Sequence, residues 1–469
     1  MTKSYAMLVD GEWSHDGEHG RTVIHSPYDG AVVAEVPVGG AKDVDRAVVA
    51  ARAALDRDDL PRAERIRILE TAARLLAERA EEFARVIADE CAKPIKAARV
   101  EVRRSCDTLA FAAAEARTHA GETVPVDAVA AGQGKIAFTV RVPIGVVAAI
   151  APFNFPLNLV VHKVAPAIAV GCPVVLKPAS QTPVSSLLLA RLLTDAGLPP
   201  GWLNVVPGGG AQVGGPLAVH PDVDYVTFTG SPEVGWGIAA AAHRKKVGLE
   251  LGSNAPLIVD ADSDWETAAA KAAVAGFVQS GQSCVSTQRI FVHHDVAGPF
   301  LAALVDGVGE LVVGDPHDER TDVSALISPG DAVRVLRWVR EAEAGGATVV
   351  AGGERVGNAV TPTVLTGVTR TMDVQCQEVF GPVVTVTEFT DFDEAIEMAN
   401  DSDFGLNAGV FTRDLGKALR ATRKLHYGSV FVNEVPTARA DQQPYGGVKD
   451  SGNTREGPRY AMEEMTELR

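Results

Sequence analysis

A cysteine and a glutamate, 34 positions apart (250 to 284), have side chains suited to acyl chemistry. Cys284 lies in SGQSCVST, a loop between a predicted helix and a predicted strand, and small neighbours leave room for a substrate. A deprotonated thiol there is a nucleophile, whereas a buried, unreactive cysteine is the commoner use of the residue. Glu250, in GLELGSN, ends a predicted strand and suits a general base toward a thiol or a water. The alternative for Glu250 is an exposed carboxylate at a strand end.

Five further residues suit an oxyanion or a nucleotide. Asn154, in PFNFP, could donate to an oxyanion together with a backbone N–H, or could serve as a turn asparagine. The chain has no GxGxxG fingerprint, but Gly230-Ser231 follows a predicted strand and opens a helix, whose start either binds phosphate or is only capped. Lys177, in LKPAS, suits ribose hydroxyls, a phosphate or plain solvent. Glu378, in QEVFGP, suits a nicotinamide ribose or is an ordinary loop carboxylate.

Composition limits the partners. Acidic residues number 60 and basic residues 44, giving a net charge of −16, which argues against nucleic acid and anionic membranes as main partners. The five cysteines are odd in number and show no CxxC spacing, which favours a reducing compartment. We see no apolar signal segment and no uncharged membrane span, so the expected location is cytoplasmic. We predict no metal site.

The elements that must position these residues alternate between strands and helices. From residue 144, GVVAAIAP, CPVVLKPAS, LNVVPGGG, YVTFTGS and KKVGLELG are strand-like and are separated by helix-like segments. A second series begins near residue 252 with APLIVD, a helix over 264–280, and RIFVH. Upstream, apolar residues at spacings of three and four predict helices over 61–91 and 95–119. This alternation predicts an α/β fold with two doubly wound parallel sheets.

The motifs, taken in order, resemble those of the aldehyde dehydrogenase superfamily. They are PFNFP, KPAS, FTGS, ELGSNAP, GQSC, EVFGP and PYGGVKDSG, and the resemblance runs from LVDGEW near residue 8 to the C-terminus. It implies an NAD(P)-dependent enzyme that oxidises a small aldehyde to its carboxylic acid. Cys284 would attack the aldehyde, the Asn154 amide and the Cys284 N–H would hold the oxyanion, and Glu250 would activate the water that hydrolyses the thioester.

The resemblance also implies which residues hold the cofactor, NAD or NADP. They are Ile150, Pro152, Phe153, Lys177, Ser180, Gly210, Phe228, Gly230, Ser231, Val234, Leu251, Glu378 and Phe380. Lys177 is counted with the catalytic residues as well. Relatives that are strict for NAD often have Glu where this chain has Ser180, so we expect both cofactors to be accepted, with Lys177 available to a 2′-phosphate.

The substrate stays open between two kinds of short aldehyde. The segment GQSCVSTQR and the tail PYGGVKDSG–REG–YAMEEMTE look most like lactaldehyde-type and related small-aldehyde members. Relatives that act on succinate semialdehyde often have Arg in the turn before the nucleophile, where this chain has Val278 and Gln279. A structural or binding protein on the same fold is a further alternative, against which the intact set of Asn154, Glu250 and Cys284 argues.

Three residues are predicted at the acyl end of the substrate. Arg439 and His162 fall where similar enzymes border the substrate, and they suit a carboxylate, phosphate, phosphonate or sulfonate on a short aldehyde. The alternative is that Arg439 only pairs with Asp441 or Glu434 at the surface. Ser283, directly before the nucleophile, is also placed at the substrate, although relatives that handle phosphate often have Arg there.

Similar enzymes have a three-part subunit. The resemblance implies a cofactor-binding domain over 1–121 and 144–251 and a catalytic domain over 252–449. Residues 122–143 and 450–469 would form an oligomerisation arm, since KIAFTVRVP alternates like an exposed hairpin strand and EEMTELR could add an edge strand. We therefore expect a homodimer or a homotetramer.

Overall fold

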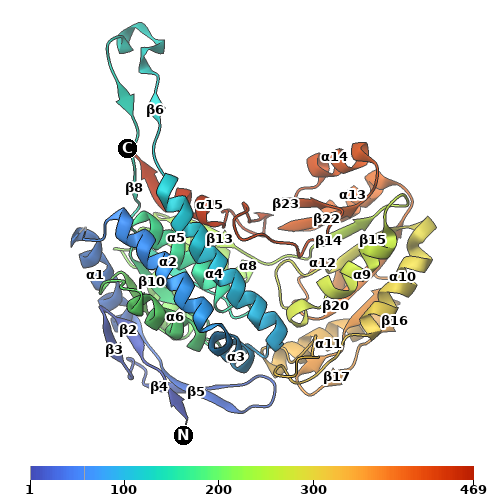
Figure 1. Ribbon diagram of the computed structural model, residues 1–469. Coiled ribbons are helices and arrows are strands. Elements are labelled where there is room, and N and C mark those ends of the chain that lie inside the picture. The colour runs from blue at the N-terminus through green and yellow to red at the C-terminus, as the bar shows by residue number, and fades with distance from the viewer. Residues whose placement is uncertain (1, 58) are drawn as a thin grey trace.

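The computed structural model describes residues 2–57 and 59–469, which form two lobes, each built on a seven-stranded sheet (Figure 1). The first sheet has the order β13 (Lys246–Glu250), β12 (Tyr225–Thr229), β9 (Val147–Ile150), β10 (Val174–Lys177), β11 (Leu203–Val205), β2 (Met7–Val9), β3 (Glu12–Ser14). Neighbours from β13 to β11 run parallel, and the antiparallel pair β2 and β3 extends the sheet beyond β11.

The second sheet is parallel except at one edge. Its order is β16 (Thr348–Ala351), β19 (Thr363–Thr366), β20 (Val383–Phe389), β15 (Arg289–His293), β14 (Pro256–Val259), β22 (Asn407–Phe411), β23 (Ser429–Val432). Only β16 pairs antiparallel with its neighbour among these described strands. The two parallel-sheet lobes confirm the α/β class predicted from the alternating segments.

Helices cover both faces of each sheet, which explains why the central strands are apolar without alternation. In the first lobe the helices are α1 (Ala41–Arg57), α2 (Arg62–Glu78), α3 (Ala80–Cys91), α4 (Ile95–Thr118), α5 (Asn158–Val170), α6 (Val184–Asp195), α7 (Gly215–Val219), α8 (Pro232–Ala241). In the second they are α9 (Trp265–Ala275), α10 (His294–Gly309), α11 (Pro329–Ala344), α12 (Asp373–Cys376), α13 (Phe392–Asn400), α14 (Leu415–Lys424). Aliphatic side chains from α2 to α6 fill the core on one face of the first sheet, and those of α1 and α7 fill the other.

Two of the predicted helices are shorter than expected. The helix expected over 61–91 breaks at Arg79, whose φ of −105° and ψ of 18° end α2 and begin α3. The apolar spacing continues across the break because both helices bury the same side, so the spacing does not reveal it. The helix expected over 264–280 ends at Ala275, and residues 278–281 form a separate turn.

Short strands outside the sheets build an arm that projects from the first lobe (Figure 1). β6 (Thr123–Val124) pairs with β7 (Ala137–Phe138), and β8 (Arg141–Pro143) pairs with β25 (Thr466–Leu468) near the C-terminus. Residues 458–464 form α15 (Pro458–Glu464), which packs on α5 of the first lobe. Three further small sheets occur among the described residues. In the first, β1 (Lys3–Ser4) and β4 (Arg21–His25) both pair with β5 (Val32–Pro37). The other two pair β17 (Arg355–Val356) with β18 (Ala359–Val360) and β21 (Phe404–Gly405) with β24 (Val448–Lys449). No helix among the described residues is long and apolar enough to cross a membrane.

Candidate active site

The carboxyl ends of four neighbouring strands bring the sequence-predicted residues to one edge of the first sheet. In the register of the sheet, Ile150 of β9 pairs with Lys177 of β10 on one side and with Phe228 of β12 on the other. Thr229, the next residue of β12, pairs with Glu250 at the end of β13. Ligands of open parallel sheets bind beyond the carboxyl ends of the strands. This edge is therefore the expected place for a cofactor.

The loop that carries Cys284 is held by backbone geometry that few sequences tolerate. Residues 279, 280 and 281 all have positive φ values, of 56°, 56° and 71°. At Gly281 a side chain would collide with the carbonyl oxygen of Gly381, so only glycine fits. The Ser280 hydroxyl donates to the Ser324 carbonyl at 2.9 Å and accepts from the Ser324 N–H at 3.0 Å. These constraints fix the thiol at the junction of the two lobes.

Two side chains from other segments lie beside this loop. The Asn154 amide is buried and donates to the Gln282 carbonyl at 2.9 Å, which places it two residues from Cys284. The Tyr445 hydroxyl lies 2.9 Å from the Cys284 sulfur. Burial raises the pKa of the Cys284 thiol to about 12, and the hydrogen bond with Tyr445 opposes that rise. In the protein as it stands the thiol is therefore protonated at neutral pH.

Glu250 is buried, and both its carboxylate oxygens lack a hydrogen-bond partner within the described chain. Burial, and then the charge of Glu456, raise the pKa of Glu250 well above its usual value. Gly446 makes room for the side chain, because a Cβ there would lie 2.6 Å from a Glu250 oxygen. An unpartnered carboxyl with a raised pKa has the properties of a general base or acid.

The phosphate and ribose end of the predicted cofactor site is formed by Lys177, Ser180 and the start of α8. Lys177 is buried, and burial lowers its pKa to about 8. Its ammonium donates one hydrogen bond to the Pro178 carbonyl at 2.9 Å, and its other N–H groups can donate to a ligand. The Ser180 hydroxyl is exposed and donates to the Gly208 carbonyl at 3.0 Å. Ser231 opens α8 without capping it, so the free N–H groups there suit a phosphate.

The nicotinamide end is marked by a carboxylate and two aromatic rings. Glu378 accepts from the Ser253 N–H at 2.9 Å, and burial raises its pKa to about 7. The rings of Phe153 and Phe380 meet edge to face with centroids 5.8 Å apart, and Phe380 holds a positive φ of 46°. Three features together fit a nicotinamide dinucleotide: the buried ammonium of Lys177, the uncapped start of α8, and the Glu378 carboxylate, which can bind ribose hydroxyls. The nicotinamide ring accepts hydride when the cofactor is bound.

The other residues predicted for the cofactor surround the same edge. Pro152 precedes Phe153 in the loop after β9, and Leu251 follows Glu250 and is buried. A side chain on Gly235 in α8 would collide with Leu251, so helix and strand pack closely there. Gly230 donates its N–H to the Glu250 carbonyl at 3.1 Å. Val234 is half exposed on α8, and Gly210 begins the single π-helical turn Gly210–Gly214.

A cavity of about 480 Å³ opens beside Cys284. Phe155, Leu159 and Val285 form apolar parts of its wall, and Ser283 lines it next to Cys284. Four cationic side chains, Lys93, Lys96, Arg104 and Arg439, line it together with one carboxylate, Glu101. The basic wall contrasts with the acidic chain as a whole. The cavity is large enough to hold a short substrate whose reacting carbon lies next to the Cys284 thiol.

Arg439 lies in this wall and is not the surface residue that the alternative interpretation required. Its side chain is 8% exposed, and its Nη2 donates to Glu456 at 3.0 Å. Asp441 is 3.9 Å from Nε, which is too long for a hydrogen bond, and Nε is buried without a partner in the described structure. Glu434 instead pairs with Lys271. Arg439 thus lines the cavity, and its buried Nε has no partner among the described residues.

His162 lies behind the cavity wall and does not line it, unlike the position predicted from the sequence. Its Nε2 is 3.0 Å from Asp441, and the other ring nitrogen, Nδ1, has no partner among the described residues. Burial lowers the pKa of His162, so the ring is neutral at neutral pH. Asp441 also accepts a two-pronged pair of bonds from Arg104, at 2.8 and 3.0 Å. His162 therefore contacts Asp441, which also holds Arg104 of the cavity wall.

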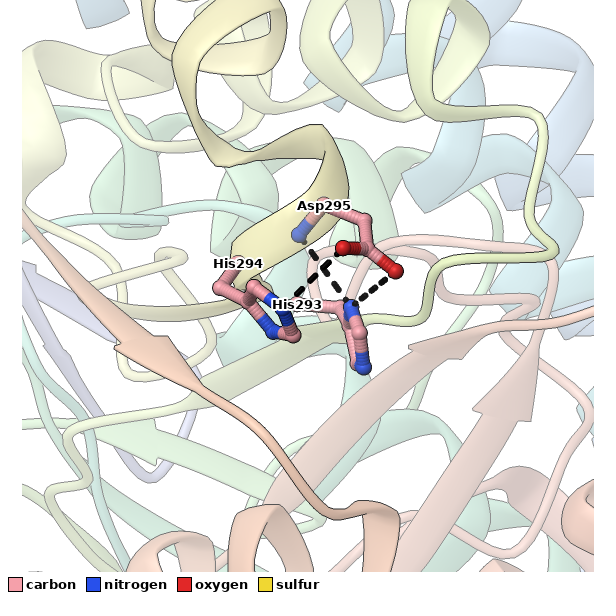
Figure 2. A group of neighbouring side chains, drawn as sticks. All are labelled: His293, His294 and Asp295. Atoms are coloured by element: carbon pink, nitrogen blue, oxygen red, sulfur yellow. Dashed lines mark hydrogen bonds and ion pairs between the residues drawn. The ribbon is translucent and has the colours of Figure 1, made fainter.

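One group of side chains in the described chain could together hold a metal ion, at His293, His294 and Asp295 (Figure 2). His293 already caps α10 by accepting from the Asp295 N–H at 3.3 Å, and its other nitrogen lies 3.2 Å from the Thr390 carbonyl. His294 and Asp295 are exposed. The group stands at the far end of β15 from the Cys284 loop. It therefore plays no part in the active site.

Tyr445 and Arg104 are among the residues of the site that were not assigned from the sequence. Tyr445 stands in the quoted motif PYGG, which was noted only as a family signature. Arg104 lies in the middle of α4, where a charged residue ordinarily indicates a solvated helix face. The position of Tyr445 in a glycine turn was the available signal. Arg104 had none, because a fold is needed to bring α4 to the cavity.

The edge of the first sheet fits a dinucleotide, and a loop cysteine, an amide and a carboxyl lie beside it. Together these features define a cofactor-dependent enzyme that works through a thiol. The chain belongs to the aldehyde dehydrogenase family, whose family model matches residues 13–469. It is an NAD(P)-dependent oxidoreductase that acts on an aldehyde.

Relatives match over nearly the whole chain. A 3-sulfolactaldehyde dehydrogenase of Priestia aryabhattai is 46% identical over all of this chain and 98% of its own length. A lactaldehyde dehydrogenase of Methanococcus vannielii is 36% identical over 99% of this chain and 98% of its own.

Solved structures agree closely in fold. Aldehyde dehydrogenase 21 from Physcomitrella patens, in complex with the reaction product succinate, is 40% identical with a TM-score of 0.96, covering 100% of this chain and 98% of that chain. An NADP-dependent glyceraldehyde-3-phosphate dehydrogenase from Bacillus halodurans, complexed with NADP, is 36% identical with a TM-score of 0.97, covering 99% and 98%.

Proposed function

We propose that this enzyme oxidises a short aldehyde with an anionic group at its far end, such as 3-sulfolactaldehyde, to the free carboxylic acid. Cys284 gives up its thiol proton to solvent and attacks the aldehyde carbon, and the Asn154 amide and the Cys284 N–H stabilise the oxyanion. A bound nicotinamide would supply the acceptor for the hydride that this adduct loses, which would leave a thioester on Cys284. Glu250 then removes a proton from the water that hydrolyses the thioester, and the acid leaves.

The guanidinium of Arg439, which lines the cavity beside Cys284, supports the choice of an anionic substrate. Nε of this residue is buried without a partner at a wall shared with Cys284. A buried, unpaired N–H costs free energy, and a ligand oxygen that accepts from it removes that cost. The chain is also 46% identical to a protein named for an aldehyde that carries a sulfonate. A sulfonate, phosphonate or carboxylate is the kind of acceptor a guanidinium holds best.

A neutral hydroxyaldehyde such as lactaldehyde is the second candidate. The four cations of the cavity each have a carboxylate partner already: Lys93 with Glu101, Lys96 with Asp322, Arg104 with Asp441, and Arg439 with Glu456. A wall whose charges are balanced attracts an anion less strongly. Relatives at 36% identity are named for lactaldehyde.

The two candidates are separated by a substrate panel. Purified protein is given 3-sulfolactaldehyde, lactaldehyde and phosphorylated and carboxylated aldehydes of similar length, each with NAD and with NADP, and reduced cofactor is followed by absorbance. We expect kcat/KM for 3-sulfolactaldehyde to exceed that for lactaldehyde by about tenfold or more, the usual worth of one charge-assisted hydrogen bond. Equal values, or a preference for lactaldehyde, would reject the anionic substrate and leave the second candidate.

Acceptance of both NAD and NADP forms part of this proposal. Ser180 offers a hydroxyl where a carboxylate would repel a 2′-phosphate, and its oxygen lies in the loop directly after Lys177 and β10. Lys177 has donors to spare. A solved relative holds NADP.

Self-association is a further part of the proposal. The arm presents Ile136 at 89% exposure and Phe138 at 68%, and α8 leaves Trp236 at 38%. Exposed apolar groups of this kind mark contacts between chains. We propose that residues 122–143 and the final strand hold together a homodimer or homotetramer. In the same proposal, residues 1–121 and 144–251 bind the cofactor, and residues 252–449 carry out catalysis. The proposed location of the enzyme is the cytoplasm. Size measurement by light scattering, with Phe138→Glu as the perturbed variant, tests the arm.

A further inference from the structure

A buried hydroxyl lies against the atom that carries the chemistry. The Tyr445 oxygen is 2.9 Å from the Cys284 sulfur, and either atom can be the donor. Tyr445 is 2% exposed. A thiol can donate to the hydroxyl, but a thiolate can only accept, so deprotonation of Cys284 turns the same contact into a charge-assisted O–H···S⁻ bond.

The surroundings hold Tyr445 in this position. Its N–H donates to the Glu456 carbonyl at 3.1 Å, and the Glu456 N–H donates back at 2.6 Å. Its ring packs against Val285 and Leu406, with Cys284 at the edge of the same cluster. Gly446 follows without a side chain, since one there would collide with the Thr454 carbonyl. The hydroxyl is therefore placed in advance of the reaction.

A cation strengthens the hydroxyl as a donor. The Arg439 guanidinium lies 3.7 Å from the centre of the Tyr445 ring, a stacked cation–π arrangement. Positive charge on the ring face draws electron density from the phenol and makes the O–H a better hydrogen-bond donor. Burial raises the pKa of Tyr445 well above its usual value, so the hydroxyl keeps its proton at neutral pH.

The charged groups around the thiol act in opposite directions. Burial disfavours the thiolate most, the negative charges of Glu378 and Glu250 disfavour it further, and Tyr445 and Arg439 favour it. Tyr445 is the favourable group in direct contact with the sulfur. A hydrogen bond to an ion is worth more than one to a neutral group, so this contact matters most in the deprotonated state.

We propose that Tyr445 is a catalytic residue whose hydroxyl donates a hydrogen bond to the Cys284 sulfur and thereby stabilises the thiolate that attacks the aldehyde. This role rests on the proposed function of Cys284 as the nucleophile. It also gives Arg439 a second effect, because its guanidinium touches both the ring and the substrate cavity.

The test measures how fast iodoacetamide alkylates Cys284 in wild type, Tyr445→Phe and Tyr225→Phe without substrate, peptide by peptide, by mass spectrometry. Tyr225→Phe is the matched control, since it removes a buried hydroxyl that bonds to Thr454. Partly exposed Cys376 in the same molecules is the internal reference. Phenylalanine keeps the ring, and thermal unfolding with a cofactor-binding titration checks that each variant is folded.

We expect Tyr445→Phe to slow alkylation of Cys284 by about 10- to 100-fold at each pH between about 7 and 9, because loss of the bond raises the thiol pKa by about one to two units. Cys376 and the Tyr225→Phe protein should react as wild type does. An unchanged rate, or a faster one, would overturn the proposal, because the hydroxyl would then be inert or would restrain the thiol. Turnover by Cys284→Ala separates the two claims: an active variant rejects the proposed nucleophile, whereas an inactive variant with an unchanged Tyr445→Phe alkylation rate rejects only the role of Tyr445.

Discussion

Replacing Arg439 with methionine should lower activity toward an anionic aldehyde much more than toward a neutral one. Methionine keeps about the length of the aliphatic part of the arginine side chain while removing the guanidinium, which lines the cavity and includes the unpaired Nε. The change also leaves Glu456 with Lys163 as its remaining cation, at 3.3 Å, and uncovers the Tyr445 ring. Those two losses affect every substrate alike. Only the missing donor depends on the charge of the substrate.

The magnitude follows from that difference. A hydrogen bond between a charged donor and a charged acceptor is worth about 1.5–3 kcal/mol. Since about 1.4 kcal/mol is a factor of ten, the ratio of kcat/KM for 3-sulfolactaldehyde to that for lactaldehyde should fall roughly 10- to 100-fold in Arg439→Met. The assay follows reduced cofactor at substrate concentrations far below KM, where the initial rate gives kcat/KM directly.

Lactaldehyde is the internal control for the shared losses, and Arg337→Met is the control variant. Arg337 is exposed on α11 and pairs loosely with Glu341 at 3.7 Å, so its replacement should leave both substrates unaffected. Equal losses for both aldehydes in Arg439→Met would show that Arg439 serves the fold or the thiol alone. That result would refute the reasoning from the unpaired donor.

Three further substitutions test the rest of the site. Glu250→Gln should still release a burst of one equivalent of reduced cofactor but should slow steady turnover at least tenfold, as stopped-flow absorbance measures, because only hydrolysis needs the base. Asn154→Ala should lower kcat by about 10²–10³, the usual loss for one oxyanion donor, measured at saturating substrate. Ser180→Glu should shift the ratio of kcat/KM values toward NAD by about tenfold or more, because a carboxylate repels the 2′-phosphate.

Each of these expectations has a contrary outcome. Loss of burst and turnover in equal measure would assign Glu250 to activation of the thiol. A change of less than about threefold in Asn154→Ala would remove its amide from the oxyanion site, since one such donor is normally worth 10²–10³. A wild-type enzyme with no measurable rate on NADP would show that Ser180 does not select the cofactor.

The fold was predictable because its signals are local. Strands such as 147–150 and 174–177 are apolar runs between helical segments, and the alternation alone indicates parallel sheets. Lys177 ends the second of these runs, Glu250 ends the strand 246–250, and the register brings both to one edge of the sheet. The break at Arg79 was not predictable, since both helices keep the same apolar side.

The wall of the cavity was less predictable because it is built from distant segments. Arg104 comes from α4, and Arg439 comes from a loop more than 300 residues later. Asp441 lies between them and contacts both guanidinium groups. His162 has the spacing of a residue at the cavity, but burial of α5 on all sides puts its ring behind the wall. Sequence spacing does not show which of two buried neighbours faces a ligand.

The most direct test of the account is to trap the acyl group on its cysteine. Glu250→Gln enzyme is mixed with NADP and 3-sulfolactaldehyde, quenched in acid within the burst, digested and examined by peptide mass spectrometry. We predict an added mass equal to the acyl group on the peptide that contains Cys284, close to one per active site, and none in Cys284→Ala, which should not turn over. An acyl group on another residue, or turnover by Cys284→Ala above a few per cent of wild type, would contradict the account.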